Sequence, residues 1–274
     1  MSNVTATARR LEALRTALEA QGMAGAILSR PQHLFYFTGT MLGPSPAFLI
    51  VLPQRVIAVA SAPLADCETI TYTDYDIRNG WSVIEGATGA LDQALASGNL
   101  AGKEVGLELS HLPAIFMPTI QEHTGAPREI GDLLWSLRWV KDTVEIAQIE
   151  ANVAGNDRAF RAVQEAIRPG ITGIDLWAVV YHTMCNVAGG PITLEADLGV
   201  GPLSSNPDAK PGHERLATGD TVFVDVYSAI RGYYADTTRV FTVGEPNDKQ
   251  REIHDILAAA LAAGQSALRP SALA

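Results

Sequence analysis

The sequence predicts an α/β (α+β) protein in two parts, an N-terminal α/β domain over residues 1–136 and a second segment over residues 137–274. Two patterns predict this class. In the first part, short apolar runs alternate with segments whose apolar residues recur at helical spacing. In the second part, two long helical patterns precede a pair of strand-like runs joined by a short connection that contains glycine.

The first part reads as alternating strands and helices. Leu11, Leu14 and Leu18 lie near helical spacing and the pattern ends at Gly22, so a helix is expected from 8 to 20. The next runs are rich in apolar or β-branched residues and are short enough for strands. The expected elements are strands at 24–28, 47–52, 56–60 and 104–108, and helices at 87–96 and 112–123.

The second part begins with a helix from Asp142, where Glu145 three residues later makes a capping-box-like pair. That helix ends at Pro169-Gly170 and another is expected over 176–187. A last helix begins at about Asn247 or Asp248 and ends near Leu268. The first and last of these helices end in the same Arg-Pro step, which indicates either coincidence or the start of a repeated unit.

Asp225 and Asp236 lie in the two strand-like runs of a predicted β-hairpin. Numbering the hairpin about a tip at Ile230-Arg231 places Asp225 opposite Asp236, with Cβ atoms about 5 Å apart. Carboxylates that close repel each other, so a shared proton or a cation is expected between them. Two metal ions about 3.5–4 Å apart suit such a pair. The alternative is a pair of solvated strand aspartates.

Composition restricts the class of partner and the compartment. The formal net charge is −10, with 20 Lys and Arg against 30 Asp and Glu, which disfavours nucleic acid as a partner. The sequence has no apolar run long enough to span a bilayer. Cys67 and Cys185 are the only cysteines and are far apart, so no disulfide framework is expected. These observations predict a soluble cytoplasmic protein without membrane or nucleic-acid partners.

Several segments, in order, resemble the creatinase, prolidase and aminopeptidase P (Xaa-Pro peptidase) metallopeptidase family, which has the pita-bread fold. The likeness covers most of the chain, and its most specific part is the hairpin with Asp225 and Asp236. The segments are Gly22-Met-Ala-Gly-Ala-Ile-Leu28, His33-Leu-Phe-Tyr-Phe-Thr-Gly39, Arg138-Trp-Val-Lys-Asp-Thr-Val-Glu-Ile146, Gly219-Asp220 and Gly232-Tyr-Tyr-Ala-Asp-Thr-Thr-Arg239.

This resemblance implies a creatinase/prolidase N-terminal-like domain followed by the first half of a pita-bread domain. It implies a hydrolase in which metal-activated water cleaves a small peptide or amide. Asp225 and Asp236 would be two of about five ligands of a dinuclear site for Mn, Co or Zn. A His and two Glu of the second half would complete it, and this sequence ends at Ala274, before that half. The chain alone is therefore expected to be inactive, with no catalytic residue assigned, and to form a homodimer or bind a complementing C-terminal half.

Three positions depart from the family pattern. Tyr227 stands where members often have glycine. Asp208, after Pro207, stands where peptidase members usually carry a substrate-side His, and His213 is either a displaced substitute or an exposed loop residue. These departures keep two alternatives open. One is a non-catalytic remnant that serves as a binding or dimerisation module, and the other is a non-peptidase member that acts on a small C–N substrate.

Overall fold

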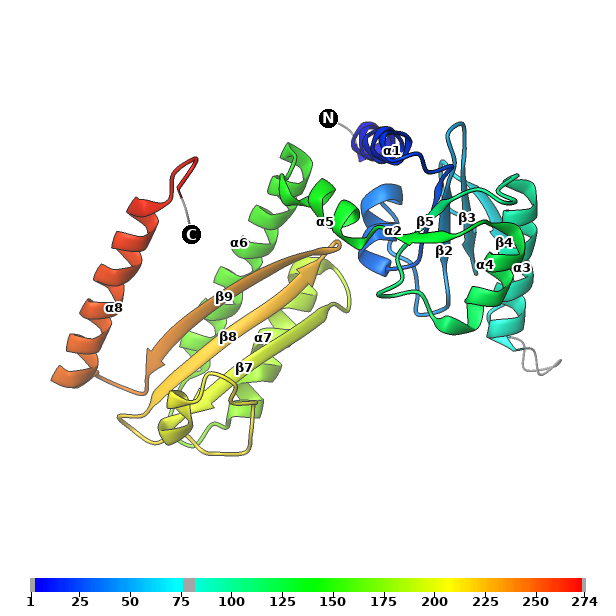
Figure 1. The fold of residues 1–274 in the computed structure, drawn as a ribbon. Helices are drawn as coiled ribbons and strands as arrows, with labels where there is room; N and C mark the ends of the chain where they lie inside the picture. Colours follow the sequence, from blue (N-terminus) through cyan, green and yellow to red (C-terminus); the bar gives the residue numbers. More distant parts are fainter. Residues whose placement is uncertain (1–2, 76–81, 273–274) are drawn as a thin grey trace. The chain divides into compact units, whose positions relative to one another are not determined.

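The computed structural model describes residues 3–75 and 82–272 and divides into two compact units, 1–146 and 147–274 (Figure 1). The first unit ends at residue 146, ten residues after the end expected from the sequence at 136. Each unit has its own sheet and its own hydrophobic core. None of the helices in the described ranges is long and apolar enough to cross a membrane.

The first unit is built on a mixed six-stranded sheet with the order β4-β3-β2-β1-β5-β6. Pairs β1–β2 and β2–β3 are antiparallel, whereas β1–β5, β5–β6 and β3–β4 are parallel. The predicted hairpin of strands at 47–52 and 56–60 is confirmed as β2–β3. The strands are β1 (Ala26–Leu28), β2 (Phe48–Val51), β3 (Val56–Ala60), β4 (Glu68–Thr71), β5 (Val105–Leu107) and β6 (Pro127–Glu129).

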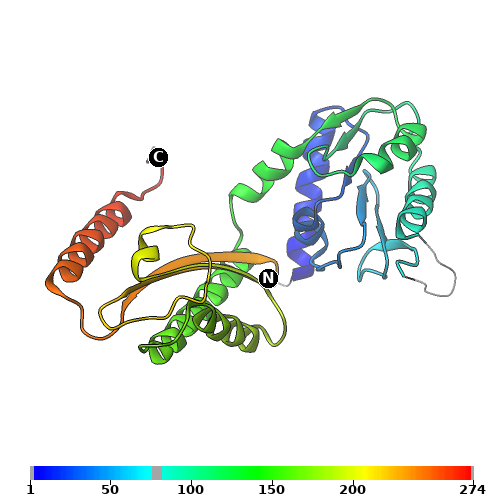
Figure 2. The same cartoon turned by 90° about the horizontal axis from the view of Figure 1, so that it is seen from below.

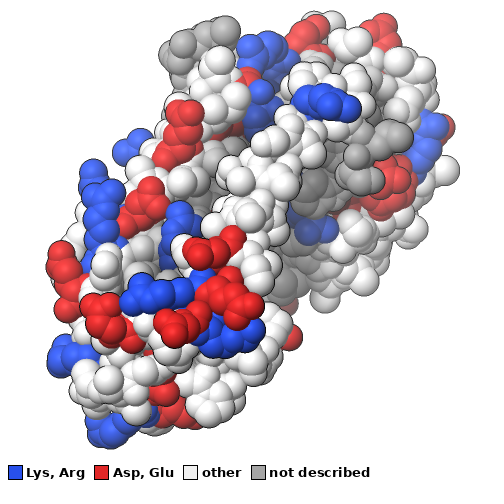
Figure 3. Space-filling view, turned by 90° about the vertical axis from the view of Figure 1, so that its left-hand side faces the viewer, with Lys and Arg blue, Asp and Glu red and all other residues white. Residues whose placement is uncertain are grey.

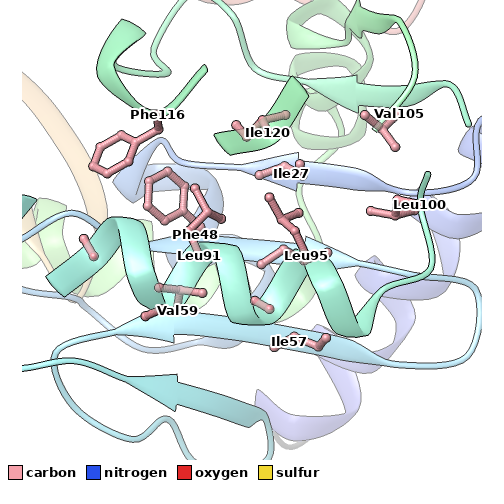
Figure 4. Packing of buried hydrophobic residues seen from close by; sticks show 14 of the residues in the cluster. Ile27, Phe48, Ile57, Val59, Leu91, Leu95, Leu100, Val105, Phe116 and Ile120 are labelled. Carbon is pink, nitrogen blue, oxygen red and sulfur yellow. The ribbon is translucent and has the colours of Figure 1, made fainter. Parts of the chain in front are cut away.

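Helices cover both faces of this sheet. Ile27, Phe48 and Ile57 belong to a core with α3 and α4, which Figure 4 shows in close-up. Leu28 and Leu49, which alternate with them along the strands, belong to a second core with α1, α2 and α5. Burial on both faces explains why these strands are almost continuously apolar. The helices are α1 (Asn3–Ala20), α2 (Pro31–Thr38), α3 (Val83–Ser97), η1 (Ala114–Phe116), α4 (Met117–His123) and α5 (Gly131–Trp139).

The second unit carries an antiparallel three-stranded sheet, β7-β8-β9, with α6 and α7 on one face (Figures 1 and 2). Val222, Val224 and Val226 of β8 point to that face and pack with Phe160 and Leu176 of the helices. The elements are α6 (Thr143–Ala166), which begins just before the unit boundary, α7 (Gly173–Ala188), β7 (Thr193–Val200), η2 (Gly201–Ser205), β8 (Thr221–Ile230), β9 (Tyr233–Thr242) and α8 (Asp248–Ala267).

Side-chain caps fix where the long helices begin. The predicted pair at the start of α6 is confirmed: the N–H of Glu145 donates to Asp142 Oδ1 at 2.9 Å, and Glu145 Oε2 accepts from the Asp142 N–H at 2.9 Å. Thr172 and Asp175 form a capping box at α7, and Asn247 does so at α8. Each box satisfies backbone donors that the first helical turn leaves without partners.

The β8–β9 hairpin forms as predicted, but the predicted register is wrong by two residues. Its two-residue turn is Arg231-Gly232, with φ of 51° and 80°, so Ile230 pairs with Tyr233. Two central residues with positive φ suit the right-handed strand twist, and glycine adopts such angles at little cost. Asp225 therefore pairs with Thr238 rather than with Asp236.

Candidate metal centre

Asp225 and Asp236 still lie on one face of the sheet, the face opposite α6 and α7. Because side chains alternate with a period of two, a shift of two residues changes the partner and keeps the face. Asp225 is diagonal to Asp236, which pairs directly with Tyr227. Diagonal neighbours remain within reach of each other, at about 7–8 Å between backbones. The two carboxylates are thus neighbours, although they are not directly opposed.

The Asp225 carboxylate is buried and held at both oxygens. The residue is 9% exposed. Its Oδ1 accepts a hydrogen bond from the Thr238 hydroxyl at 2.6 Å, and its Oδ2 accepts one from the Tyr227 hydroxyl at 2.5 Å. Both donors come from the same face of the sheet, so the strand register itself orients the carboxylate.

Asp236 is more exposed and has a perturbed acidity. The pKa of Asp236 is raised, first because its carboxylate loses water where it faces the sheet, and then through the charge and the hydrogen bonding of Asp225. A raised pKa means that the folded protein disfavours the doubly ionised pair. A cation beside these two carboxylates would relieve that cost.

A third carboxylate on this face, Asp197 of β7, was not identified from the sequence. It pairs directly with Asp225 across β7–β8 and is 6% exposed. The ammonium of Lys210 donates to Asp197 Oδ1. The signal was available, because apolar and polar residues alternate over Thr193–Val200, which is typical of a strand with one buried face. Because a strand was not predicted at Thr193–Val200, Asp197 could not be placed beside the hairpin from the sequence.

The two predicted substrate-side residues lie on the connection between η2 and β8. Asp208 and His213 are both exposed. The hydrogen bond that Lys210 donates to Asp197 is the main cause of the raised pKa of Lys210, and the charge of Asp208 raises that pKa further. The structure does not bring either residue into hydrogen-bond contact with Asp225 or Asp236 through the contacts it describes. Their role stays a prediction.

A buried polar cluster on the helix side anchors the hairpin behind the carboxylates. The Asn152 amide of α6 donates to the carbonyls of Ser228 at 2.8 Å and Tyr233 at 2.7 Å. The Ser228 hydroxyl contacts Asn152 Oδ1 at 2.9 Å and Asn156 Oδ1 at 2.7 Å, and Asn156 donates to Thr237 Oγ1 at 3.2 Å. These bonds tie α6 to both strands and fix the register that places Asp225 and Asp236.

The donors present fit part of a site for a hard cation. Carboxylate oxygens are the ligands that such cations prefer, and each oxygen of Asp225 accepts one hydroxyl and keeps further acceptor capacity. Within residues 3–75 and 82–272, no three His, Cys, Asp or Glu side chains are arranged to hold an ion together. Two carboxylates are therefore what this chain's described residues offer to a divalent metal.

Two other polar side chains of the segments that carry the family resemblance make contacts away from Asp225 and Asp236. His33 is fully buried, and its Nδ1 lies 2.7 Å from Glu108 Oε1. Arg239 lies on the helix face of β9, where its guanidinium is 5.4 Å from the Phe160 ring centroid and 3.7 Å from Asp157 Oδ1.

Comparisons with known proteins match both units. Residues 10–140 match the Creatinase/Prolidase N-terminal domain, and residues 147–274 match Metallopeptidase family M24. The chain is 26% identical over 281 residues to a probable dipeptidase PepE of Mycobacterium bovis, covering 97% of this chain and 72% of that protein. It is 24% identical over 277 residues to an Xaa-Pro dipeptidase of Lactobacillus delbrueckii subsp. lactis, covering 95% and 72%.

Solved structures show the same fold. An Xaa-Pro dipeptidase from Bacillus anthracis superposes with a TM-score of 0.76 at 21% identity, over 93% of this chain and 70% of that one. The order of the two matched domains, the mixed sheet of the first unit and the helix-backed hairpin of the second agree with the resemblance found in the sequence. The chain belongs to the creatinase, prolidase and aminopeptidase P family, with an N-terminal creatinase-like domain followed by a segment of metallopeptidase family M24.

Proposed function

We propose that this chain is the larger part of a metal-dependent hydrolase that cleaves a small peptide or amide of the Xaa-Pro type. The observation that carries the proposal is the pair Asp225 and Asp236, adjacent on the face of the β7-β8-β9 sheet opposite α6 and α7. Relatives described as dipeptidases and Xaa-Pro dipeptidases support the substrate class. A divalent ion, when bound, lowers the pKa of water and polarises a substrate carbonyl.

Asp225 and Asp236 have different parts in this proposal. Asp225 is buried and held at both oxygens, so it offers a fixed ligand with little conformational entropy left to lose. Asp236 is more exposed and has the raised pKa, so it gives up its proton when the cation binds. Metal affinity should therefore increase with pH through the range in which Asp236 ionises. We propose Mn, Co or Zn as the metal and a dinuclear site in the complete enzyme.

The remaining ligands belong to a partner in this proposal. The chain spans 72% of the dipeptidases that it matches, and we propose that a complementing C-terminal half supplies these ligands, with a homodimer as the alternative partner. Helix α8 supports this because Ile256, Leu257 and Leu261 along one side are 60–65% exposed. An apolar stripe of this kind is a surface for association. We propose the cytoplasm as the compartment, because Cys67 and Cys185 are free cysteines that lie far apart in the sequence.

The test is a titration of the 274-residue chain with Mn²⁺, in which electron paramagnetic resonance counts the free ion. We expect binding that is lost or at least about tenfold weaker in Asp225→Ala and Asp236→Ala. Asp255→Ala, an exposed aspartate of α8, is the matched control and should bind like the wild type. Equal binding by all four proteins would refute the metal site.

One observation favours a second function. Asp208 stands where peptidase members usually carry a substrate-side His, which supports a non-peptidase member acting on another small C–N bond. Assays of the complemented protein on Xaa-Pro dipeptides and on small amides or amidines would separate the two. If metal binds and no substrate of either class is cleaved, the non-catalytic binding or dimerisation module is favoured.

A further inference from the structure

Tyr227 occupies the centre of the carboxylate face. It follows Asp225 by two residues on β8 and pairs with Asp236 on β9. Its hydroxyl lies 2.5 Å from Asp225 Oδ2 and 3.4 Å from Asp197 Oδ2. One phenol oxygen therefore lies between two opposed carboxylates of neighbouring strands, at a position where a glycine would offer no side chain.

The phenol has one proton and two acceptors within reach. Hydrogen bonds from a hydroxyl to a carboxylate are strongest at about 2.5–2.7 Å, so the proton is directed at Asp225 rather than at Asp197. Lys210 explains this preference, because its ammonium donates to Asp197 and compensates its charge. Asp197 thus has its own cation, and the Tyr227 hydroxyl is left for Asp225.

The contacts form one line across the sheet, from Lys210 through Asp197 and Tyr227 to Asp225 and Thr238. Without the phenol, Asp197 and Asp225 would be opposed like charges on neighbouring strands, which is unfavourable. The Asp225 carboxylate would then be held at one oxygen, by the Thr238 hydroxyl alone. The hydroxyl both separates the two charges and fixes the plane of the Asp225 carboxylate.

We propose that Tyr227 is a positioning residue for the metal ligand Asp225, and that its hydroxyl orients this carboxylate toward the ion. The inference rests on the proposed metal site and goes beyond it by assigning a residue that a glycine could not replace. Groups that hydrogen-bond to ligating carboxylates typically account for about 10–100-fold in metal affinity. A ring without the hydroxyl should therefore pack in the same place and bind metal less tightly.

The experiment compares Tyr227→Phe with the wild-type chain by Mn²⁺ titration and by the tyrosine ultraviolet difference spectrum on metal addition. We expect Tyr227→Phe to bind Mn²⁺ about tenfold or more weakly and to lose the tyrosine difference signal. Tyr234→Phe makes the same chemical change on the same face, on a tyrosine that is 53% exposed, and should keep both the affinity and the signal. Circular dichroism checks that both variants are folded.

The outcomes separate this inference from the proposed function. If Asp225→Ala abolishes Mn²⁺ binding while Tyr227→Phe binds as tightly as the wild type, the metal site stands and the role of Tyr227 is refuted. Tighter binding by Tyr227→Phe also refutes it, since the hydroxyl would then compete with the ion. If the wild type and Asp225→Ala bind alike or neither binds, the proposed metal site fails and the inference fails with it.

Discussion

The two sheets of this molecule differ in how many of their faces are buried by helices, and that difference decides where a site can form. The sheet of the first unit is packed on both faces, and its central strands are apolar throughout. The long helices of the second unit pack on one face of its sheet, and the other face carries Asp197, Asp225 and Asp236. A doubly covered sheet makes a scaffold, whereas a singly covered one can present polar groups at positions fixed by strand pairing.

A buried carboxylate of the first unit, that of Glu108, lies at the end of a strand. Glu108 directly follows β5 and is 1% exposed. Its carboxylate accepts a hydrogen bond from Arg30 Nε at 2.8 Å and lies beside the His33 ring. Burial by itself raises the pKa of Glu108, but the hydrogen bonds and charges of His33 and Arg30 outweigh it and the pKa is lowered. The ionised form is thus part of the folded state.

The largest expected effect comes from removing the buried carboxylate of Glu108. Glu108→Ala leaves the side chains of His33 and Arg30 without their carboxylate and should lower the free energy of unfolding by about 3–5 kcal/mol. Urea unfolding followed by the fluorescence of Trp135, whose ring lies edge-on to His33, measures it. Glu104→Ala is the control, because its pair with Arg128 is about 40% exposed and should contribute at most about 1 kcal/mol. Equal costs would contradict the burial argument.

The second prediction concerns the covered face of the other sheet. Asn152→Leu removes the amide that donates to the Ser228 and Tyr233 carbonyls and should lower the free energy of unfolding by about 1–3 kcal/mol. Hydrogen exchange of the β8–β9 amides should become faster. Asn186→Leu, at an exposed position of α7, should leave both the stability and the exchange unchanged. Slower exchange in Asn152→Leu would show that the cluster does not anchor the hairpin.

The third prediction concerns α8, none of whose described residues is buried. Leu257→Lys with Leu261→Lys should change the free energy of unfolding by no more than about 0.5 kcal/mol, because neither side chain is buried. Size-exclusion chromatography should show that the variant loses the self-association we expect of the wild type. Ala259→Lys with Ser266→Lys adds the same charge to the opposite side of the helix and should associate like the wild type. Association by both variants would exclude the apolar stripe as the interface.

Acidic and basic side chains are interspersed on the face of the molecule that Figure 3 shows.

Most helices and the central strands could be predicted from the sequence, because apolar spacing and caps such as Asp142 with Glu145 are local signals. The hairpin register could not, because it depends on whether Arg231 accepts a positive φ, and a shift of the turn by one residue moves every pair. The face of Asp225 and Asp236 was nevertheless predicted, since the error was an even number of residues.

The rest of the site depends on contacts that a local pattern does not contain. Lys210 reaches Asp197 from a connection without regular structure, and Asn152 reaches Ser228 across 76 residues of chain. Asp197 could have been placed only by recognising β7 and its register with β8 at the same time. Strand partners and side-chain hydrogen bonds are tertiary information, and they turn two isolated aspartates into an ordered face.

The smallest expected effect concerns the carboxyl proton of Asp236, on the face of the sheet opposite α6 and α7. Because the pKa of Asp236 is raised, the folded chain binds this proton more tightly than the unfolded chain. Stability from this group therefore increases as pH falls through the folded pKa toward the unfolded one, and decreases as pH rises.

Asp236→Asn removes the ionisation, so in the presence of a chelator it should be slightly more stable than the wild type at about pH 7. The difference should vanish at about pH 3, below the ordinary Asp pKa of about 3.9, where the carboxyl is protonated in both the folded and the unfolded chain. Urea unfolding at both pH values measures this, with Asp255→Asn as a control that should show no such pH dependence. A wild type that is the more stable protein at neutral pH without metal would mean that Asp236 is not strained by its neighbours. The electrostatic reason for a cation to bind beside Asp225 and Asp236 would then be absent.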